Sequence, residues 1–236
     1  SDMSNDTSWG SNGTVGRSGS CRTYYPYGMK VHDGIIYVSS YYDRRVRKIR
    51  VSDGACLGSL NAGSNYSYPQ GLEIHNGHLY VTTRYGLYTY NISNGAGKMC
   101  PGKNSSQWRY TRAIAASGNY LYSYYNYRMY RGTLTTSGSN ICPTTEKNYY
   151  NSSMSYGEGL AAHPSNPNEL YFMSRGRNAI YKITVDSSGT FHTQNWKKGR
   201  YGYNRTSTAT QNYFYYPQSL HYDDDNDRLV VAGYNS

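Results

Sequence analysis

The phrase YPQGLEIHNGHLYV, which occupies Tyr68–Val81, nearly repeats the phrase YPYGMKVHDGIIYV of Tyr25–Val38. The two copies start 43 residues apart. Each contains an apolar alternation, a turn with glycine and a second apolar run. A period of this length is typical of one supersecondary unit repeated along an array. The repeat therefore decides the fold before any single residue is considered for its chemistry.

Five copies of the phrase follow one another along the chain. Leading strands are expected at 28–32, 71–75, 113–117, 159–163 and 219–223. Second strands are expected at 36–38, 79–81, 121–123, 170–172 and 229–231. Third strands are expected in four copies, at 46–49, 87–90, 129–132 and 180–183, each followed by a turn and a more polar fourth strand. Four short strands joined by tight turns at this period form one blade of a β-propeller.

We therefore predict an all-β fold, a five-bladed β-propeller that forms a single domain over residues 1–236. The fifth copy has only two strands, and 13–21 matches the third and fourth strands of the other copies. The ring is expected to close by pairing N-terminal strands with the C-terminal hairpin, which hides two sheet edges. An insertion is expected within 194–214. The expected blade limits are 26–64, 65–108, 109–153, 154–214, and 215–236 together with 12–25.

The order Pro-X-Gly, apolar alternation, glycine turn and Ile/Leu-Tyr-Val resembles the NHL and YVTN class of β-propeller repeats. The residues that carry this resemblance are Pro26, Gly28, Gly34, Tyr37 and Val38 in the first copy and Pro69, Gly71, Gly77, Tyr80 and Val81 in the second. The third and fifth copies lack the leading glycine. The class includes lyases, lactonases, RNA-binding domains and protein-interaction modules, so function must be argued from sites.

The composition is rich in tyrosine and basic overall. The chain contains 31 Tyr against 3 Phe and 3 Trp, and 24 Lys plus Arg against 14 Asp plus Glu, a net charge of +10. Such a field favours anionic partners, including acidic glycans and nucleic acid. No stretch approaches the ~18 apolar residues that a membrane-spanning helix needs, so no membrane insertion is expected.

Sequons and cysteines bear on the compartment. Asn-X-Ser/Thr sequons indicate an exported, glycosylated protein, and they occur at Asn5, Asn12, Asn65, Asn91, Asn104, Asn151 and Asn204. An even number of cysteines in such a chain favours disulfides. Equivalent positions on the outer rims of neighbouring blades, however, are expected to exceed the ~7 Å limit between Cα atoms. Disulfides and packed free thiols therefore both remain open for Cys21, Cys56, Cys100 and Cys142.

The links between second and third strands are rich in arginine and tyrosine. In a propeller these links lie on one face, around the mouth of the central channel. Guanidinium groups suit phosphate, sulfate and carboxylate, while tyrosine supplies a stacking face for a sugar or a base. Ordinary solvated turns and a protein interface are the alternatives. The predicted ligand-binding residues are Arg44, Arg45, Arg84, Tyr85, Tyr125, Arg128, Arg175 and Arg177.

Metal sites have weaker candidates. His32, His75 and His163 recur at the ends of leading strands, where they suit a metal or simple turn caps. Calcium is conceivable at the carboxylates of Asp223, Asp225 and Asp227, although an acidic hairpin tip that pairs with surface arginine is favoured. No phosphate-binding loop, dinucleotide fingerprint or Gly-X-Ser-X-Gly motif occurs. No catalytic residue and no cofactor are therefore predicted.

These features favour a secreted, non-enzymatic binding propeller that recognises acidic or hydroxyl-rich polymers such as glycans, or a protein partner including itself. The alternatives are a self-assembling subunit of a glycosylated extracellular fibre or coat, an RNA-binding propeller of the NHL type, and a metal-dependent lyase or lactonase.

Overall fold

The computed structural model describes residues 21–61, 67–100, 108–134, 142–152, 154–198 and 217–233. Within these ranges the chain forms antiparallel strands and one three-residue 3-10 helix, η1 (Asp224–Asn226). No helix there has the length and apolar character required to cross a membrane. The expected all-β architecture is confirmed.

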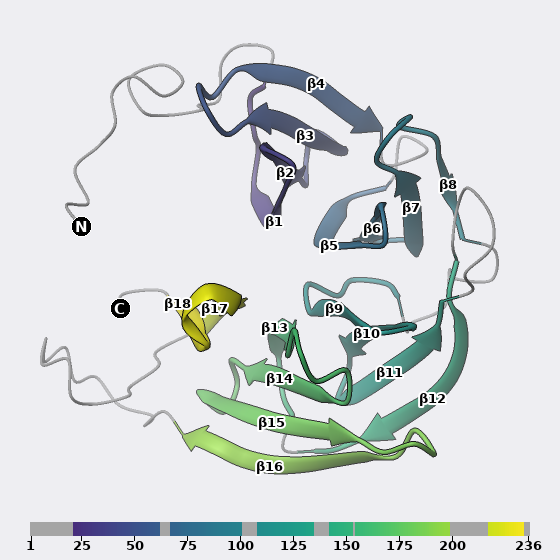
Figure 1. The fold of residues 1–236 in the computed structure, drawn as a ribbon, viewed down its shortest axis with the longest axis vertical. Helices are drawn as coiled ribbons and strands as arrows, with labels where there is room; N and C mark the ends of the chain where they lie inside the picture. Colours follow the sequence, from purple (N-terminus) through teal and green to yellow (C-terminus); the bar gives the residue numbers. More distant parts are fainter. Residues whose placement is uncertain are drawn as a thin grey trace, which may run out of the picture.

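Four sheets of four strands each follow one another around a ring (Figure 1). The first contains β1 (Pro26–His32), β2 (Ile35–Ser40), β3 (Arg45–Arg50) and β4 (Cys56–Asn61). The second contains β5 (Pro69–His75), β6 (His78–Thr83), β7 (Leu87–Asn91) and β8 (Gly97–Met99). The third contains β9 (Ile114–Ser117), β10 (Tyr120–Tyr125), β11 (Arg128–Thr133) and β12 (Thr144–Tyr150). The fourth contains β13 (Gly157–Ala162), β14 (Glu169–Ser174), β15 (Ala179–Val185) and β16 (Phe191–Lys198).

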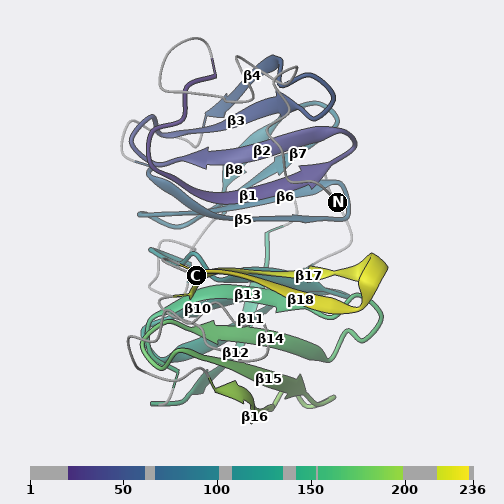
Figure 2. The same ribbon diagram turned by 90° about the vertical axis from the view of Figure 1, so that its left-hand side faces the viewer.

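Each sheet is a propeller blade whose strands lie in chain order from the inside outwards. Neighbouring blades contact each other through their inner strands, β1 with β5, β5 with β9, β9 with β13, and β13 with β17 (Pro217–Asp223). The side view in Figure 2 shows the blades stacked face to face. The apolar cores lie between consecutive blades; one such cluster joins Tyr37 and Val46 of the first blade to Leu72, Leu79 and Val81 of the second.

The Pro-X-Gly motif marks a bulge at which one blade touches the next. In β1 the pairing register with β2 shifts between Pro26 and Met29, and β5 shows the same shift between Pro69 and Leu72. A Cβ atom on Gly28 would lie 2.5 Å from the carbonyl oxygen of Gln70. Glycine is therefore required at this position, because any side chain would collide with the backbone of the following blade.

A buried hydroxyl on the second strand ties consecutive blades together. Ser39 Oγ accepts a hydrogen bond from Gly28 N and donates one to Gln70 O, both at 2.7 Å. Thr82 Oγ1 repeats the arrangement one blade later, accepting from Gly71 N at 2.9 Å and donating to Thr111 O at 2.6 Å. The hydroxyl thus satisfies the backbone groups that the bulge removes from the ladder.

Five blades and a closed ring are not established. The last sheet contains only β17 and β18 (Arg228–Gly233), and no pairing among the described strands joins it to β1. Figure 1 shows an interval between β18 and β1. The segment 12–25 was expected to complete a fifth blade; its residues 12–20 lie outside the described residues, and its residues 21–25 form no strand. An insertion was expected within 194–214. Residues 194–198 of this range belong to β16, and the rest of the range lies outside the described residues.

All four cysteines are paired, so the geometric objection to disulfides was wrong. Cys21 is bonded to Cys56 and Cys100 to Cys142, with Cα atoms 5.3 and 5.4 Å apart. The objection assumed that the cysteines occupy equivalent positions in neighbouring blades. Instead, Cys100 follows the end of β8, whereas Cys142 precedes the start of β12 in the next blade. The twisted outer strands follow one another head to tail along the rim (Figure 1). The end of one outer strand therefore lies close to the start of the outer strand in the next blade.

Candidate functional site

Tyrosine and arginine side chains gather at the edge of the ring where second strands turn into third strands. Antiparallel strands place these turns at the same edge as the links that lead into each first strand. The backbone shows this directly, since Tyr41 N donates to Tyr25 O and Arg84 N donates to Tyr68 O, both at 3.2 Å. Side chains from two kinds of segment therefore share one surface.

Six tyrosine rings form a continuous cluster over the first two blades. Centroids are 5.1 Å apart for Tyr24 with Tyr42, Tyr25 with Tyr42, and Tyr41 with Tyr42. Tyr41 also lies 5.1 Å from Tyr27 and 4.7 Å from Tyr68. Most pairs are edge-to-face or tilted, the arrangement that the ring quadrupole favours. Tyr24, Tyr25 and Tyr42 expose 42, 54 and 51% of their surface, so the cluster faces solvent.

Arginines extend the cluster towards the third blade. The guanidinium of Arg44 lies 5.2 Å from the ring of Tyr68 and donates a 3.3 Å hydrogen bond to its hydroxyl. The guanidinium of Arg84 lies 5.7–5.8 Å from the rings of Tyr68, Tyr85 and Tyr110. Its hydrogen bond to the Tyr110 hydroxyl raises the pKa of Arg84. Arginine is cationic at physiological pH in any case, so this contact places a fixed positive charge among the rings.

A second group of side chains, two arginines and a glutamate, extends this surface towards the inner strands. The guanidinium of Arg112 lies 3.9 Å from the centroid of Tyr27 and donates a 2.7 Å hydrogen bond to Glu158 Oε2. Arg175 contacts Glu158 Oε1 at 3.3 Å from the other side. One carboxylate is thus held between two guanidinium groups, and residues of blades one, three and four are connected.

We call this surface the tyrosine–arginine platform. Its members are Tyr24, Tyr25, Tyr27, Tyr41, Arg44, Tyr42, Tyr68, Arg84, Tyr85, Arg109, Tyr110 and Arg112.

The structure brings together only some of the predicted ligand-binding residues. Arg44, Arg84 and Tyr85 lie within the platform, and Arg175 reaches it through Glu158. Arg45 lies next to it, in a pocket beside Arg44. The remaining three have no recorded contact with the platform among the described residues. Arg128 stacks on Tyr150 of the outer strand at 5.2 Å, Arg177 is exposed near Tyr181, and Tyr125 is half-buried at the end of β10.

Sequence reasoning missed the members that come from the links. Tyr25 and Tyr68 directly precede the proline of the repeat, and Tyr110 and Arg112 occupy the same region of the third copy. The sequence does contain a signal for these residues, because a tyrosine precedes the first strand in several repeats, at the same spacing from the turn that follows the second strand. It was overlooked because the link and the turn lie well apart in each repeat and meet only when the blade folds.

The predicted histidines do not converge. His75 Nε2 lies 2.7 Å from Gly118 O, His32 contacts Asp33 at 3.3 Å, and His163 Nδ1 accepts hydrogen bonds from the N–H groups of Ser165 and Asn166. No group of three His, Cys, Asp or Glu suited to a metal ion occurs in the described ranges. The histidines lie at separate strand ends, where each bonds to a local or neighbouring loop.

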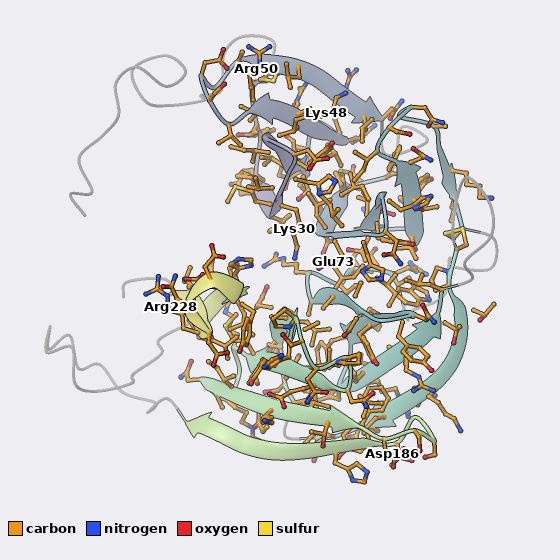
Figure 3. All side chains as sticks on the ribbon, in the orientation of Figure 1. Lys30, Lys48, Arg50, Glu73, Asp186 and Arg228 are labelled. Atoms are coloured by element: carbon orange, nitrogen blue, oxygen red, sulfur yellow. A yellow bond between two sulfur atoms is a disulfide. The ribbon has the colours of Figure 1, made fainter. Side chains whose placement is uncertain are left out.

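The acidic hairpin at the tip of β17 and β18 makes internal contacts. Asp223 accepts a 2.7 Å hydrogen bond from Arg228 Nε, and this contact is the largest cause of its lowered pKa. Arg228 is labelled in Figure 3. Asp227 accepts a hydrogen bond from the Tyr222 hydroxyl, and Asp225 is exposed. The predicted pairing of this tip with arginine is present, and it uses Arg228 of the same hairpin.

Two predicted glycosylation sites are described. Asn91 ends β7 and accepts hydrogen bonds from Ser93 through Oδ1. Asn151 follows β12 and donates from Nδ2 to Thr193 Oγ1 at 3.3 Å. Both side chains are half-buried. Asn5, Asn12, Asn65, Asn104 and Asn204 lie outside the described residues.

Comparison with known proteins supports the fold alone. No protein-family model matches the sequence, so nothing assigns the chain to the NHL repeats in particular. No curated protein is matched by sequence either.

Solved structures do share the architecture. A protein from Lactobacillus plantarum superposes with a TM-score of 0.64 at 16% identity, over 89% of this chain and 64% of the other. An auxiliary nutrient binding protein from Bacteroides ovatus gives 0.60 at 16% identity, over 89 and 57%. A candidate 6-phosphogluconolactonase from Bacteroides uniformis gives 0.58 at 12% identity, over 72 and 53%. The chain is a β-propeller that spans between half and two thirds of the length of these three chains.

Proposed function

We propose that this chain is a non-enzymatic binding propeller of the extracellular space, which recognises acidic or hydroxyl-rich polymers, glycans above all, through the tyrosine–arginine platform. The observation that carries the proposal is the continuity of the platform. Tyrosine rings and guanidinium groups follow one another from the first blade to the third, each within about 6 Å of the next.

The chemistry of the platform suits such a ligand. Tyrosine offers an apolar face on which a sugar ring stacks and a hydroxyl that hydrogen-bonds to it. Arginine offers a planar fork that matches sulfate, phosphate and carboxylate. The edge-to-face contacts hold the rings in fixed positions, which lowers the entropy lost on binding. An extended polymer would contact several blades at once and gain affinity from repeated weak contacts.

A binding role also fits the carboxylate that joins Arg112 to Arg175. Glu158 accepts hydrogen bonds from Arg112 and Arg175, at 2.7 and 3.3 Å. Both carboxylate oxygens are thus engaged by guanidinium groups, which holds the side chain in place as part of the binding surface. The known structures with this fold include a nutrient-binding protein and a candidate lactonase, so the fold is compatible with either kind of activity.

Two disulfides and seven sequons support an extracellular location. Disulfides persist in oxidising compartments and are rare in the cytosol. Intact mass of the native protein, before and after enzymatic deglycosylation, tests this part directly. A mass equal to that of the bare chain would remove the glycoprotein proposal.

Binding to heparin, to uncharged dextran and to single-stranded poly(A) tests the function. Arg84→Gln and Tyr42→Ala are expected to weaken polysaccharide binding about tenfold, because each removes a stacking or charged contact worth ~1–3 kcal/mol. Arg128→Gln and Tyr150→Ala are matched controls, since this pair also stacks, at 5.2 Å, but on the outer strand. Tyr150 exposes 55% of its surface, close to the 51% of Tyr42.

Each alternative has its own outcome in this experiment. Tighter binding of poly(A) than of either polysaccharide would favour the RNA-binding alternative. No polymer binding combined with concentration-dependent self-association would favour a structural subunit. Equal losses in the platform variants and the controls would show that the platform is not the binding surface.

We also propose that the ring closes through a fifth blade built from β17, β18 and the segment 12–25. On β1, Lys30 forms a 2.8 Å salt bridge with Glu73 of the second blade. Both residues are labelled in Figure 3. The alternate residues Met29 and Val31 point the opposite way and are 64 and 59% exposed. Leu72, the counterpart of Met29 in the second blade, is 3% exposed because it packs on the first blade. Exposed apolar residues at these positions favour a covering blade.

Val31→Asp tests closure. In a closed ring the substitution buries a charge and costs several kcal/mol, whereas on an open face it changes stability by about 0.5 kcal/mol or less. Val51→Asp, in the turn after β3 where the side chain is 41% exposed, is the control. Equal stabilities of the two variants in urea unfolding would contradict closure.

A further inference from the structure

A pocket of about 370 Å³ opens next to the platform, on the first blade. Its lining includes four arginines, Arg22, Arg44, Arg45 and Arg47, together with Asp43 and Tyr42. Tyr42 and Arg44 also belong to the platform, so the pocket and the platform form one surface. The pocket lies within the ~300–1,000 Å³ range of small-molecule sites.

The lining carries a net charge of +3, because four guanidinium groups surround one carboxylate. Asp43 contacts Arg47 at 3.2 Å and Arg22 at 3.8 Å, and it accepts a 2.8 Å hydrogen bond from Ser40 Oγ. The hydrogen bond fixes the carboxylate, which in turn orients two of the arginines. Asp43 is therefore a positioning residue for this cluster of donors.

The other two arginines donate hydrogen bonds to neutral groups. Arg44 Nη2 donates to the hydroxyl of Tyr68 at 3.3 Å and Arg45 Nη1 to Ser59 Oγ at 3.4 Å. These contacts hold the two side chains in place at the pocket. A pocket with this excess of guanidinium donors is complementary to an anion with several acceptor oxygens.

We propose that this pocket is a subsite for a sulfate or phosphate ester on a sugar unit of the ligand. The ester oxygens would bind the guanidinium groups while the sugar lies against Tyr42. The volume accommodates an ester group together with the sugar that carries it. This inference rests on the proposed function, because it names the substituent that the same surface selects: the ligand is an esterified, anionic polysaccharide.

Small probes test the subsite independently of polymer binding. Titrations with glucose 6-sulfate, glucose 6-phosphate and glucose are compared for the unmodified protein and for the double variant Arg22→Gln/Arg45→Gln. Both side chains are largely exposed, so the fold is expected to persist. The control is Arg50→Gln, on the same strand as Arg45: the Arg50 side chain pairs with Asp53 and does not line the pocket. Arg50 is labelled in Figure 3.

At least one ester is expected to bind ten times more tightly than glucose, and the double variant to lose at least tenfold of that affinity, since charge-assisted hydrogen bonds are removed. Arg50→Gln should change affinity less than twofold. A preference between the two esters identifies which ester the ligand carries. Equal binding of esters and glucose, or an unchanged double variant, would overturn the subsite. If Arg84→Gln loses polymer binding but still binds the ester, the platform and the pocket contribute to binding independently.

Discussion

Arg84 Nε donates a 2.7 Å hydrogen bond to the hydroxyl of Tyr110, and the two residues belong to consecutive blades. Arg84 lies in the turn after β6, while Tyr110 lies in the link that leads to β9. Tyr110 N in turn donates to Thr83 O at 3.1 Å. The contact between these side chains is thus supported by backbone pairing between the same segments, and the platform is continuous across the blade boundary.

Arg84→Lys is expected to weaken heparin binding three- to tenfold although the charge is retained. Lysine cannot stack as a planar group on Tyr68, Tyr85 and Tyr110, and it has no Nε donor in the position of the guanidinium. Calorimetric titration measures the effect, with Arg128→Lys as the control. Unchanged affinity in Arg84→Lys would mean that only the charge matters.

Thr82→Val is expected to lower the free energy of unfolding by about 1–3 kcal/mol, because it leaves buried backbone groups of Gly71 and Thr111 without the hydroxyl that bonds them. Thr82→Ser keeps the hydroxyl and reproduces the arrangement that Ser39 provides one blade earlier. Urea unfolding of the two variants separates the hydroxyl from the methyl group. A larger loss in the serine variant would contradict the role assigned to the hydroxyl.

Removing the Cys100–Cys142 disulfide as the Cys100→Ala/Cys142→Ala variant is expected to cost about 2–4 kcal/mol. The bond closes a loop with a sequence separation of 42, for which chain entropy gives a limit of about 4 kcal/mol. Thiol titration of the unfolded, unreduced protein should find no free thiol, since all four cysteines are paired. Two or more reactive thiols per chain would refute the pairing.

Stability is expected to decrease in acid partly through Glu169. Burial raises the pKa of its carboxyl, but hydrogen bonds from Lys182, at 2.7 Å, and Tyr171 outweigh burial and leave the pKa below its usual 4.5. The unfolded chain therefore takes up this proton first as pH falls. The stabilisation is complete above about pH 4.5 and is lost as pH falls through the folded pKa.

Glu169→Gln is accordingly expected to flatten the decline of the urea midpoint between pH 6 and pH 3. Asp225→Asn, at the exposed hairpin tip, is the control and should leave the slope unchanged. A wild-type slope in Glu169→Gln would show that this ion pair does not contribute to acid sensitivity.

The strands could be predicted from the sequence because their signals are local. Alternating apolar residues, glycine turns and the repeat indicate where each strand lies, and the structure has the first two strands of all five copies and the third strands of four copies at the expected places, within about two residues at each end. The Pro-X-Gly signature was also readable, although its cause was not. Gly28 is required by the carbonyl of Gln70, a group in another blade.

The candidate site depended on tertiary structure for the opposite reason. Tyr68 and Arg44, or Arg112 and Tyr27, meet only because packed cores fix one blade against the next. The disulfides show the same limit, since the twist of the outer strands brings Cys100 to Cys142. The sequence alone determined the repeat, the strands and the supply of tyrosine and arginine. Packing between blades decided which of those side chains share a surface, because such contacts join segments that no local pattern relates.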